Sequence, residues 1–254
     1  MSNEVWKTHD AVYELDSYNH WYYASFEKFL GKRILDIGSG LGCIFQYYFK
    51  CPRELIVAAD LSLGNLEELK KRFGEHQTPK AFVHMDIGGA FPLAKLRDYH
   101  LDTIVCTNVL EHIEKESETL KNMNAILNQG DRVVIVVPAC RMLYGYLDRA
   151  AGHFRRYRLD ELKLKLEQAG FEVIHGRYLN IPGMFVWGLF NFIYGRKRTQ
   201  VMSHLEDPGQ FSVIFRILRY FNPIISAYAV AERSIPVPWG LSVVCVGQKV
   251  KSCS

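Results

Sequence analysis

Short apolar runs alternate with helical patterns along most of the chain. Five near-continuous apolar runs lie at residues 33–38, 54–60, 81–86, 102–108 and 132–139. Runs of this kind are typical of strands buried on both faces of a parallel sheet. Helices are predicted at 62–73, 116–127 and 159–169 because Ser62 is a good N-cap and Gly130 and Gly170 are stop signals. The repetition predicts right-handed crossovers and a doubly wound α/β sheet.

The last part of the chain departs from this alternation. A strand is predicted at 171–179 and a final strand at 241–250. The intervening stretch, 180–240, is predicted to be an inserted helical cap; helical spacing within it is shown by Phe211, Ile214, Leu218 and Phe221. Residues 1–30 are expected to form an N-terminal helical lid, which leaves 31–179 and 241–250 as the Rossmann-like core.

Composition narrows the class of protein. The 254 residues carry a formal net charge of +4 with interspersed acids and bases, so no nucleic-acid footprint stands out. The six cysteines form no CxxC pair, which predicts reduced thiols in a cytoplasm and no metal site. No transmembrane segment is expected, because no uncharged apolar stretch reaches the ~18 residues that a span needs.

A glycine-rich turn follows the first strand, with Gly38, Gly40 and Gly42 in "ILDIGSGLG". Glycine permits positive φ and the close approach of a ligand to the backbone. The dinucleotide fingerprint would need a third glycine where this chain has Cys43. That residue and the lack of a Tyr-x-x-x-Lys relay argue against a nicotinamide-dependent dehydrogenase.

Acidic residues end the next two strands. Asp60 can accept both hydrogen bonds of a ribose, or it can cap the helix that follows. Asp86 ends the third predicted strand, where it can bind a ligand or simply terminate the strand. The fourth strand ends in "TNVLEHI", which contains Asn108 and Val109.

Taken in order, these features resemble class I S-adenosylmethionine-dependent methyltransferases over about residues 30 to 179. The resemblance implies a mostly parallel seven-stranded sheet and S-adenosylmethionine as cofactor. It places Asp36 near the methionine ammonium, Asp86 near the adenine amino group, and Asn108 and Val109 beside the methionine and purine. The residues expected to bind the cofactor are Asp36, Gly38, Ser39, Gly40, Gly42, Asp60, Leu61, Asp86, Ile87, Asn108 and Val109.

A second likeness lies at 143–162, which resembles a subgroup of these enzymes with a GHxRRY signature. Substrates in that subgroup are varied small molecules, so the likeness supports the fold more than the acceptor. Arg158 stands where relatives often begin the next helix with Ser or Thr. Arg155 and Arg156 can bind a substrate carboxylate or pair with an acid of the protein, for which Asp148 and Asp160 are candidates.

Histidine is the residue best tuned to remove a proton from an acceptor at physiological pH. The candidate bases are His112, just past the fourth strand, His153 in the GHxRRY segment, and His20 in the lid. Each has a structural alternative. His112 can be a buried histidine bonded to backbone, His153 can organise its loop, and His20 can pack against the aromatic residues of the lid. No HExxH and no paired acids at metal spacing are present, so no metal is expected.

Aromatic residues suggest where an acceptor binds. The run 183–198 exceeds one narrow apolar stripe, so it can pack on the sheet, line an apolar pocket or lie on a membrane surface. The candidate substrate-binding residues are Tyr18, Tyr22, Tyr144, Arg156, Phe185 and Trp187.

The sequence therefore predicts in-line methyl transfer to a small, apolar or aromatic metabolite at oxygen, nitrogen or carbon, in natural-product or specialised metabolism. The sulfonium methyl is already activated, so alignment and exclusion of water are the main tasks. The alternative is a non-catalytic S-adenosylmethionine-binding protein that recruits a partner through its cap. A monomer or homodimer is expected.

Overall fold

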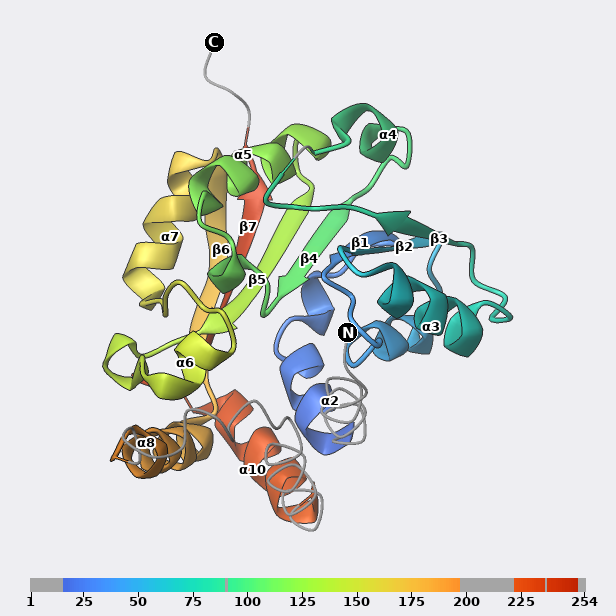
Figure 1. Ribbon diagram of the computed structural model, residues 1–254. Helices are drawn as coiled ribbons and strands as arrows, with labels where there is room; N and C mark the ends of the chain where they lie inside the picture. The colour runs from blue at the N-terminus through green and yellow to red at the C-terminus, as the bar shows by residue number, and fades with distance from the viewer. Residues whose placement is uncertain (1–15, 90, 197–221, 236, 251–254) are drawn as a thin grey trace.

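The computed structural model describes residues 16–89, 91–196, 222–235 and 237–250. A seven-stranded sheet with the order β3-β2-β1-β4-β5-β7-β6 forms its centre (Figure 1). The strands are β1 (Arg33–Ile37), β2 (Leu55–Asp60), β3 (Lys80–His84), β4 (Thr103–Thr107), β5 (Arg132–Pro138), β6 (Phe171–Leu179) and β7 (Ser242–Lys249). Only β7 among them runs antiparallel to its neighbours, β5 and β6. The mostly parallel α/β sheet expected from the sequence is thus confirmed.

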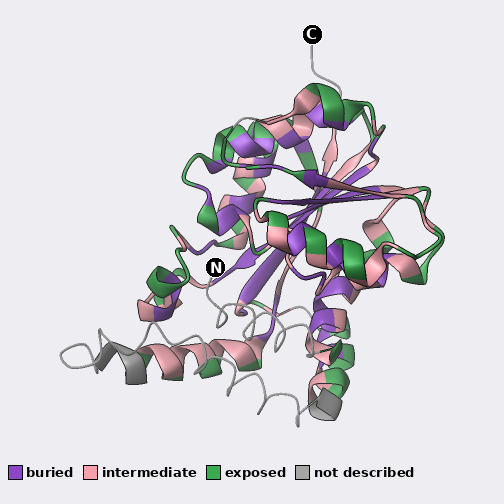
Figure 2. Ribbon diagram, turned by 45° about the vertical axis from the view of Figure 1, so that its right-hand side comes forward, coloured by how far each residue is buried: buried purple, intermediate pink, exposed green. Residues whose placement is uncertain are grey.

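Successive side chains of the central strands point to opposite faces of the sheet and enter two separate cores. Leu35 of β1 and Val57 of β2 join the core beneath α4 (Leu93–Arg97), α5 (Glu116–Ile126) and α7 (Leu159–Gln168). Ile34 and Ile56 join the other core, which contains side chains of α3 (Leu63–Phe73) and of the 3₁₀ helix η2 (Phe45–Lys50). Figure 2 shows the buried sheet between more exposed helices. Burial on both faces explains why these strands read as continuous apolar runs.

The predicted helices begin and end close to where their signals lie. The side chain of Ser62 accepts a hydrogen bond from the Asn65 backbone N–H at 3.3 Å, so it is the N-cap of α3. Gly170 follows α7 with φ of +89°, as a left-handed helix stop requires. One detail differs from the sequence prediction: β3 ends at His84, before Asp86. The glycine turn leads into the short η2.

Four helices lie at the edge of the sheet where the parallel strands end (Figure 1). They are α2 (Asp16–Ala24), α6 (Tyr146–Ala150), α8 (Ile181–Arg196) and α10 (Asn222–Ser234). Helix α2 packs beside α10, with the Trp21 and Tyr228 rings edge to face at 5.4 Å and a 2.8 Å hydrogen bond from Ser226 to Ser17. In the chain, α8 and α10 lie between β6 and β7, as expected of an insertion.

Part of the proposed lid and cap lies outside the described residues. This applies to 1–15 and to 197–221, which includes the helical repeat of Phe211, Ile214, Leu218 and Phe221. The roles of 1–30 as a lid and of 180–240 as a cap stay predictions.

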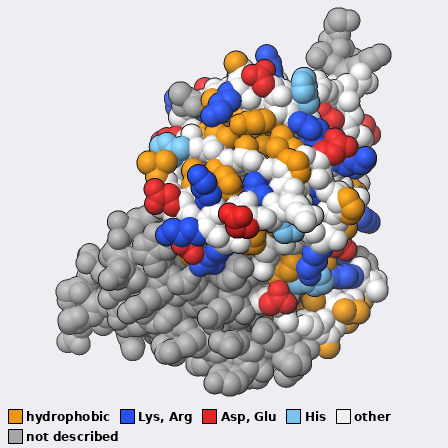
Figure 3. Space-filling model, turned by 90° about the vertical axis from the view of Figure 1, so that its right-hand side faces the viewer, with side chains coloured by type: hydrophobic (Ala, Val, Ile, Leu, Met, Phe, Trp, Pro, Cys, Tyr) orange, Lys and Arg blue, Asp and Glu red, His pale blue; other side chains and the backbone are white. Residues whose placement is uncertain are grey.

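The described surface and helices bear on two expectations of partners. No described helix is long and apolar enough to cross a membrane. On the face shown in Figure 3, basic and acidic side chains of the described residues are intermixed rather than gathered into a basic stripe. A nucleic-acid backbone would favour such a stripe.

Candidate active site

The glycine turn after β1 is held by the neighbouring strand: the Gly38 N–H donates to the Ala59 carbonyl at 2.7 Å. All three glycines have positive φ, but they face different surroundings. A Cβ on Gly38 would lie 2.2 Å from Val109 Cγ2, and one on Gly42 would lie within 3.0 Å of the Leu69 side chain. Close approach of a ligand is therefore not what excludes side chains at these two positions. Gly40 alone of the three faces open space.

Asp36 lies beside this turn and is almost completely buried. The Tyr48 hydroxyl donates to its Oδ1 at 3.0 Å, and the Ser39 hydroxyl donates to its main-chain carbonyl at 2.9 Å. Burial raises the pKa of Asp36 to about 7, with the Tyr48 hydrogen bond opposing the shift. A cationic ligand group beside Asp36 would favour its charged form, as expected of a residue near the methionine ammonium.

Asp60 ties the glycine turn to the start of α3. One oxygen accepts the Gly40 N–H at 2.8 Å; the other accepts the Ser62 N–H at 2.8 Å and the Asn65 side-chain amide at 3.1 Å. A carboxylate oxygen has two lone pairs, so Oδ2 keeps capacity for a ribose hydroxyl. The helix-side role of Asp60 is thus present, and it is compatible with ligand binding.

A pocket of about 470 Å³ opens beside β1, β2 and β3. This volume lies in the range of small-molecule and cofactor sites. Six of the eleven expected cofactor-binding residues line it: Gly38, Asp60, Leu61, Asp86, Ile87 and Val109. The other five, which are not in its lining, are Asp36, Ser39, Gly40, Gly42 and Asn108. An apolar wall with carboxylates at one side suits an adenosyl group, so the residues present fit the expected cofactor.

Two of these expected residues owe their positions to local backbone structure. Asp86 lies in the turn after β3, where its Oδ1 accepts the Gly88 N–H at 2.9 Å. Asn108 follows β4 with φ of +53°, and its N–H donates to the Val136 carbonyl at 2.8 Å. Asparagine tolerates this left-handed conformation better than most residues. The exposed Asn108 therefore turns the chain at the carboxyl end of β4.

The GHxRRY segment is bound to two acids of the protein itself. Arg155 and Tyr157 both contact the carboxylate of Glu116 on α5. His153 Nδ1 lies 3.1 Å from Asp148 Oδ1, and Arg156 Nε donates to the same oxygen at 2.6 Å. The alternative of an ion pair with Asp148 is therefore correct for Arg156, whereas Asp160 pairs with Arg158.

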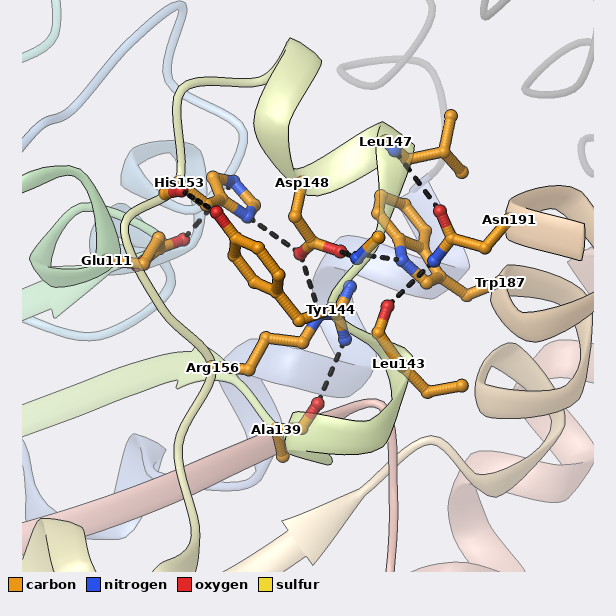
Figure 4. A network of polar contacts seen from close by, with 11 residues as sticks. Glu111, Ala139, Leu143, Tyr144, Leu147, Asp148, His153, Arg156, Trp187 and Asn191 are labelled. Atoms are coloured by element: carbon orange, nitrogen blue, oxygen red, sulfur yellow. Dashed lines mark hydrogen bonds and ion pairs between the residues drawn. The ribbon is translucent and has the colours of Figure 1, made fainter. Parts of the chain in front are cut away.

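Asp148 is the centre of a buried polar network (Figure 4). Its Oδ2 accepts the Gly145 N–H at 3.0 Å and the Trp187 indole N–H at 3.4 Å. Burial alone would raise the pKa of Asp148, but the hydrogen bond from His153 and the charge of Arg156 outweigh it and keep the pKa below its ordinary value. Asp148 therefore holds His153 and Arg156 in place as a carboxylate.

The candidate substrate-binding residues divide into three groups. Tyr144, Arg156 and Trp187 belong to the network around Asp148: the Tyr144 hydroxyl donates to the His153 carbonyl at 2.8 Å, and the Arg156 guanidinium lies 5.0 Å from the Trp187 ring centroid. Tyr18 and Tyr22 form a pair on α2, in which the Tyr18 hydroxyl donates to that of Tyr22. Phe185 on α8 is 68% exposed. None of the six lines the 470 Å³ pocket.

Tyr22 joins α2 to the last strand. Its hydroxyl lies 2.7 Å from Ser242 Oγ on β7 and accepts a 3.0 Å hydrogen bond from Tyr18. The Asn180 side chain reaches the same hydroxyl at 3.4 Å. Because Tyr22 is only 4% exposed, its hydroxyl serves contacts within the protein in this structure.

The three candidate bases are not equivalent. His112 lines the pocket, and burial together with neighbouring His153 lowers its pKa, so it carries a lone pair at physiological pH. The His112 and His153 rings are 4.7 Å apart, edge to face. His20 instead lies against Tyr47, 5.6 Å between centroids, and is not in the pocket lining.

Sequence reasoning missed several residues of the site. Tyr48 stands in an aromatic run that is typical of a core, so nothing in the sequence indicated its hydrogen bond to Asp36. Met85, Ile113 and Phe154 line the pocket but read as ordinary apolar positions. Glu111 carried one signal, its place between the end of β4 and His112, although its neighbour His153 lies far along the chain.

Comparisons with known proteins agree with this geometry. The model of a family described as a methyltransferase domain matches residues 16–176, more than half of the chain. A search of curated protein sequences gave no match.

Solved structures give the same fold. An S-adenosylmethionine-dependent methyltransferase from Mesorhizobium loti is 13% identical, with 90% of this chain and 98% of that chain covered and a TM-score of 0.56. A methyltransferase from Haloferax volcanii, solved in complex with the Trm112 methyltransferase activator, is 14% identical with a TM-score of 0.58. The match covers 92% of this chain and 90% of that chain. A phosphoethanolamine N-methyltransferase of Haemonchus contortus, bound to phosphomonomethylethanolamine and S-adenosylhomocysteine, is 14% identical with a TM-score of 0.55, covering 93% and 58%.

The sheet order, the pocket at the ends of β1 to β3 and the family match lead to one assignment. The chain belongs to the methyltransferase domain family and is a class I methyltransferase that uses S-adenosylmethionine as its cofactor.

Proposed function

We propose that this methyltransferase acts on a small, apolar or aromatic metabolite of specialised metabolism, methylated at oxygen, nitrogen or carbon. The observation that carries the proposal is exposed apolar surface at the same edge of the sheet as the cofactor residues. On α8, Phe185, Leu189 and Phe192 are more than half exposed, as is Val230 on α10. An apolar acceptor would bury such surface beside the reacting methyl group.

The composition of α8 supports the same choice. Residues 181–195 carry no charged side chain. A charged or phosphorylated acceptor lying along α8 would need a partner of opposite charge, and the nearby Arg156 is buried and already paired with Asp148. The exposed phenyl ring of Phe154, which lines the pocket, extends the apolar surface towards the cofactor site.

The chemistry asked of the protein is positional. Bound S-adenosylmethionine supplies an activated methyl group. The chain has to align the acceptor in line with that group and keep water out, which apolar walls achieve. For a hydroxyl or amine acceptor, a proton must also be removed, and His112 is the candidate base that lines the pocket.

We also place the protein in the cytoplasm. The five described cysteines, Cys43, Cys51, Cys106, Cys140 and Cys245, form no disulfide. Cys106 and Cys245 are fully buried, and burial raises the pKa of the Cys106 thiol. Buried thiols of this kind are inert and suit a reducing compartment.

The test uses methyl-labelled S-adenosylmethionine and acceptors of graded polarity, with product detection by mass spectrometry. We expect phenols and amines with alkyl substituents to be labelled, with kcat/KM rising as the substituent grows, by up to about fourfold per buried CH₂. Phosphorylated acceptors labelled equally well would contradict the proposal. A metabolite extract of the source organism then identifies the natural acceptor.

A matched pair of variants locates the acceptor surface. Leu189 on α8 and Leu164 on α7 are 57% and 54% exposed, so their substitution by serine removes similar surface. We expect Leu189→Ser to lower kcat/KM for the best apolar acceptor about threefold to tenfold. Leu164→Ser should leave it unchanged, because α7 covers the sheet rather than its carboxyl edge. Equal effects of the two changes would count against α8 as the acceptor surface.

A further inference from the structure

Three metal-ligating side chains converge at the edge of the pocket. Glu111 and His112 belong to the 3₁₀ helix η3 (Leu110–His112), directly after β4, and His153 comes from the segment between α6 and α7. One ligand atom from each lies within 4.8 Å of the others. The sequence predicted no metal site: 41 residues separate His112 from His153, and neither stands in a metal-binding motif.

Glu111 is the unusual member of the group. Its side chain is completely buried, and within the part of the chain that the structure describes neither carboxylate oxygen has a hydrogen-bond partner. An unpartnered polar group in a protein interior is costly, and a charged one more so. A cation between the carboxylate and the imidazoles would supply the missing partner.

His153 is already oriented as a ligand. Its Nδ1 lies 3.1 Å from the Asp148 carboxylate, and its Nε2 points at Glu111, 4.0 Å from Oε1 (Figure 4). When Nδ1–H donates to Asp148, Nε2 has the free lone pair. A carboxylate that fixes the tautomer and ring orientation of a ligating histidine is the usual outer shell of a metal site.

The outer shell is itself fixed. Arg156 Nε donates to Asp148 Oδ1 at 2.6 Å, and the Gly145 N–H donates to Oδ2 at 3.0 Å. Asp148 therefore cannot rotate to leave His153 without breaking buried bonds. A structural role for the network alone would account for Arg156 and Asp148 but not for the two unpartnered oxygens of Glu111.

We propose that Glu111, His112 and His153 bind one divalent first-row transition-metal ion. Two imidazoles and one carboxylate are ligands typical of Zn²⁺, Mn²⁺ or Fe²⁺, and three protein ligands leave coordination positions open. Metal–ligand bonds of roughly 2.0–2.2 Å put neighbouring ligand atoms about 3 to 3.5 Å apart, so ligand atoms that now lie up to 4.8 Å apart have to move closer by about 1 to 2 Å. His112 lines the cofactor pocket, so an ion held by these three residues would lie at the edge of that pocket.

An ion at this place has a use that follows from the proposed function and rests on it. A metal ion lowers the pKa of a bound hydroxyl, so it would orient and activate an oxygen acceptor without a free histidine base. Metal binding itself does not depend on the nature of the acceptor. The two proposals can therefore fail separately.

The test measures binding without any acceptor. Tag-free full-length protein is stripped with a chelator and dialysed in separate experiments against Zn²⁺, Mn²⁺ and Co²⁺ at neutral pH, and bound metal is measured by mass spectrometry. We expect one equivalent of at least one ion, and visible absorption bands with Co²⁺ that report nitrogen and oxygen ligands. Failure of all three ions to bind would overturn the proposal.

Variants assign the ion to this cluster. Glu111→Gln keeps shape and removes charge, and His153→Asn removes the imidazole; both should abolish stoichiometric uptake and the Co²⁺ bands. Asp148→Asn should weaken binding about 10-fold to 100-fold. The control is His100→Asn, since His100 is exposed and has a φ of +45° that asparagine accepts; uptake should equal that of the unchanged protein.

Two outcomes would contradict this assignment: unchanged binding in both Glu111→Gln and His153→Asn, or a loss of binding in His100→Asn as well. Thermal unfolding with and without Zn²⁺ covers the case in which a variant folds poorly. The folded fraction of Glu111→Gln should show no metal-induced rise in Tm, whereas the unchanged protein gains one by mass action. Methylation of apolar acceptors by the metal-free protein would show that the ion has no catalytic role, but it would not contradict metal binding at this cluster.

Discussion

The Tyr48 hydroxyl donates a 3.0 Å hydrogen bond to Asp36, which joins η2 to the end of β1 inside the protein. This bond supports a carboxyl group that is otherwise expensive to bury, because burial raises the pKa of Asp36 to about 7 from an ordinary 3.8. Without a cation nearby, Asp36 is therefore partly protonated at neutral pH. We propose, as the resemblance implies, that the positively charged end of the cofactor lies near Asp36.

The first prediction concerns pH and Asp36. An acid with a higher pKa in the folded chain binds more protons there, so its contribution to stability falls as pH rises from 3.8 through about 7 and then levels off. Asp36→Asn should remove this fall. Between pH 5 and pH 8, the unfolding free energy of Asp36→Asn should therefore fall by roughly 1 to 3 kcal/mol less than that of the unchanged protein. Denaturant unfolding without cofactor measures both.

Cofactor binding gives the opposite pH response at the same residue. A cationic ligand favours ionised Asp36, so affinity for S-adenosylmethionine should rise between pH 6 and pH 8, with proton release detected by calorimetry in two buffers. Asp36→Asn should bind more weakly and with no such rise. An equal rise in the variant would show that another group, for which Glu111 is the obvious candidate, carries the pH dependence.

The second prediction concerns Asp60, which accepts three hydrogen bonds within the protein. Asp60→Ala leaves the Gly40 and Ser62 N–H groups without this partner, so unfolding free energy should fall by about 1 to 3 kcal/mol. Affinity for S-adenosylmethionine should fall by a similar amount, measured by calorimetry. Asn65→Ala is the control, because it removes one donor and keeps the carboxylate; its affinity should stay near that of the unchanged protein.

The third prediction separates packing from backbone strain in the glycine turn. Gly38→Ala puts a Cβ against Val109 at a φ of +69°, whereas Gly40→Ala, at +53°, meets nothing within 4 Å. We expect Gly40→Ala to cost about 1 to 2 kcal/mol of unfolding free energy from φ alone, and Gly38→Ala to cost more. Adding Val109→Ala should relieve part of the Gly38→Ala cost; strict additivity of the two changes would refute the packing explanation.

The sequence anticipated the elements that local pattern defines. The strands around Ile34 and Ile56 were predictable because burial on both sheet faces leaves an uninterrupted apolar run, and α3 because Ser62 supplies a cap. The identity of the cofactor followed from the family resemblance that the glycine turn, Asp60 and Asp86 show when taken in order. Each of these signals is readable within one short segment of the chain.

Contacts between distant segments were not readable in this way. Glu116 and Tyr157 meet although 41 residues separate them, and nothing in either segment announces the other. The same holds for Glu111 and His153, which only the fold brings together. The end of β3 was predicted two residues too late, at Asp86 instead of His84, because β3 lies at the edge of the sheet and pairs with one neighbour only.

The last prediction decides what Tyr22 does. Sequence reasoning placed it at the acceptor, whereas the structure bonds its hydroxyl to Ser242 across the junction of α2 and β7. Tyr22→Phe keeps the ring and removes that bond, so unfolding free energy should fall by about 1 kcal/mol. If the hydroxyl serves only this junction, KM for the best acceptor stays unchanged. Ser242→Ala is the matched control, because it breaks the same bond from the other side without touching an aromatic ring. A rise in KM with Tyr22→Phe but not with Ser242→Ala would show that Tyr22 binds the acceptor. Both changes remove the same hydrogen bond, so only a direct contact of the Tyr22 hydroxyl with substrate would make their KM values differ.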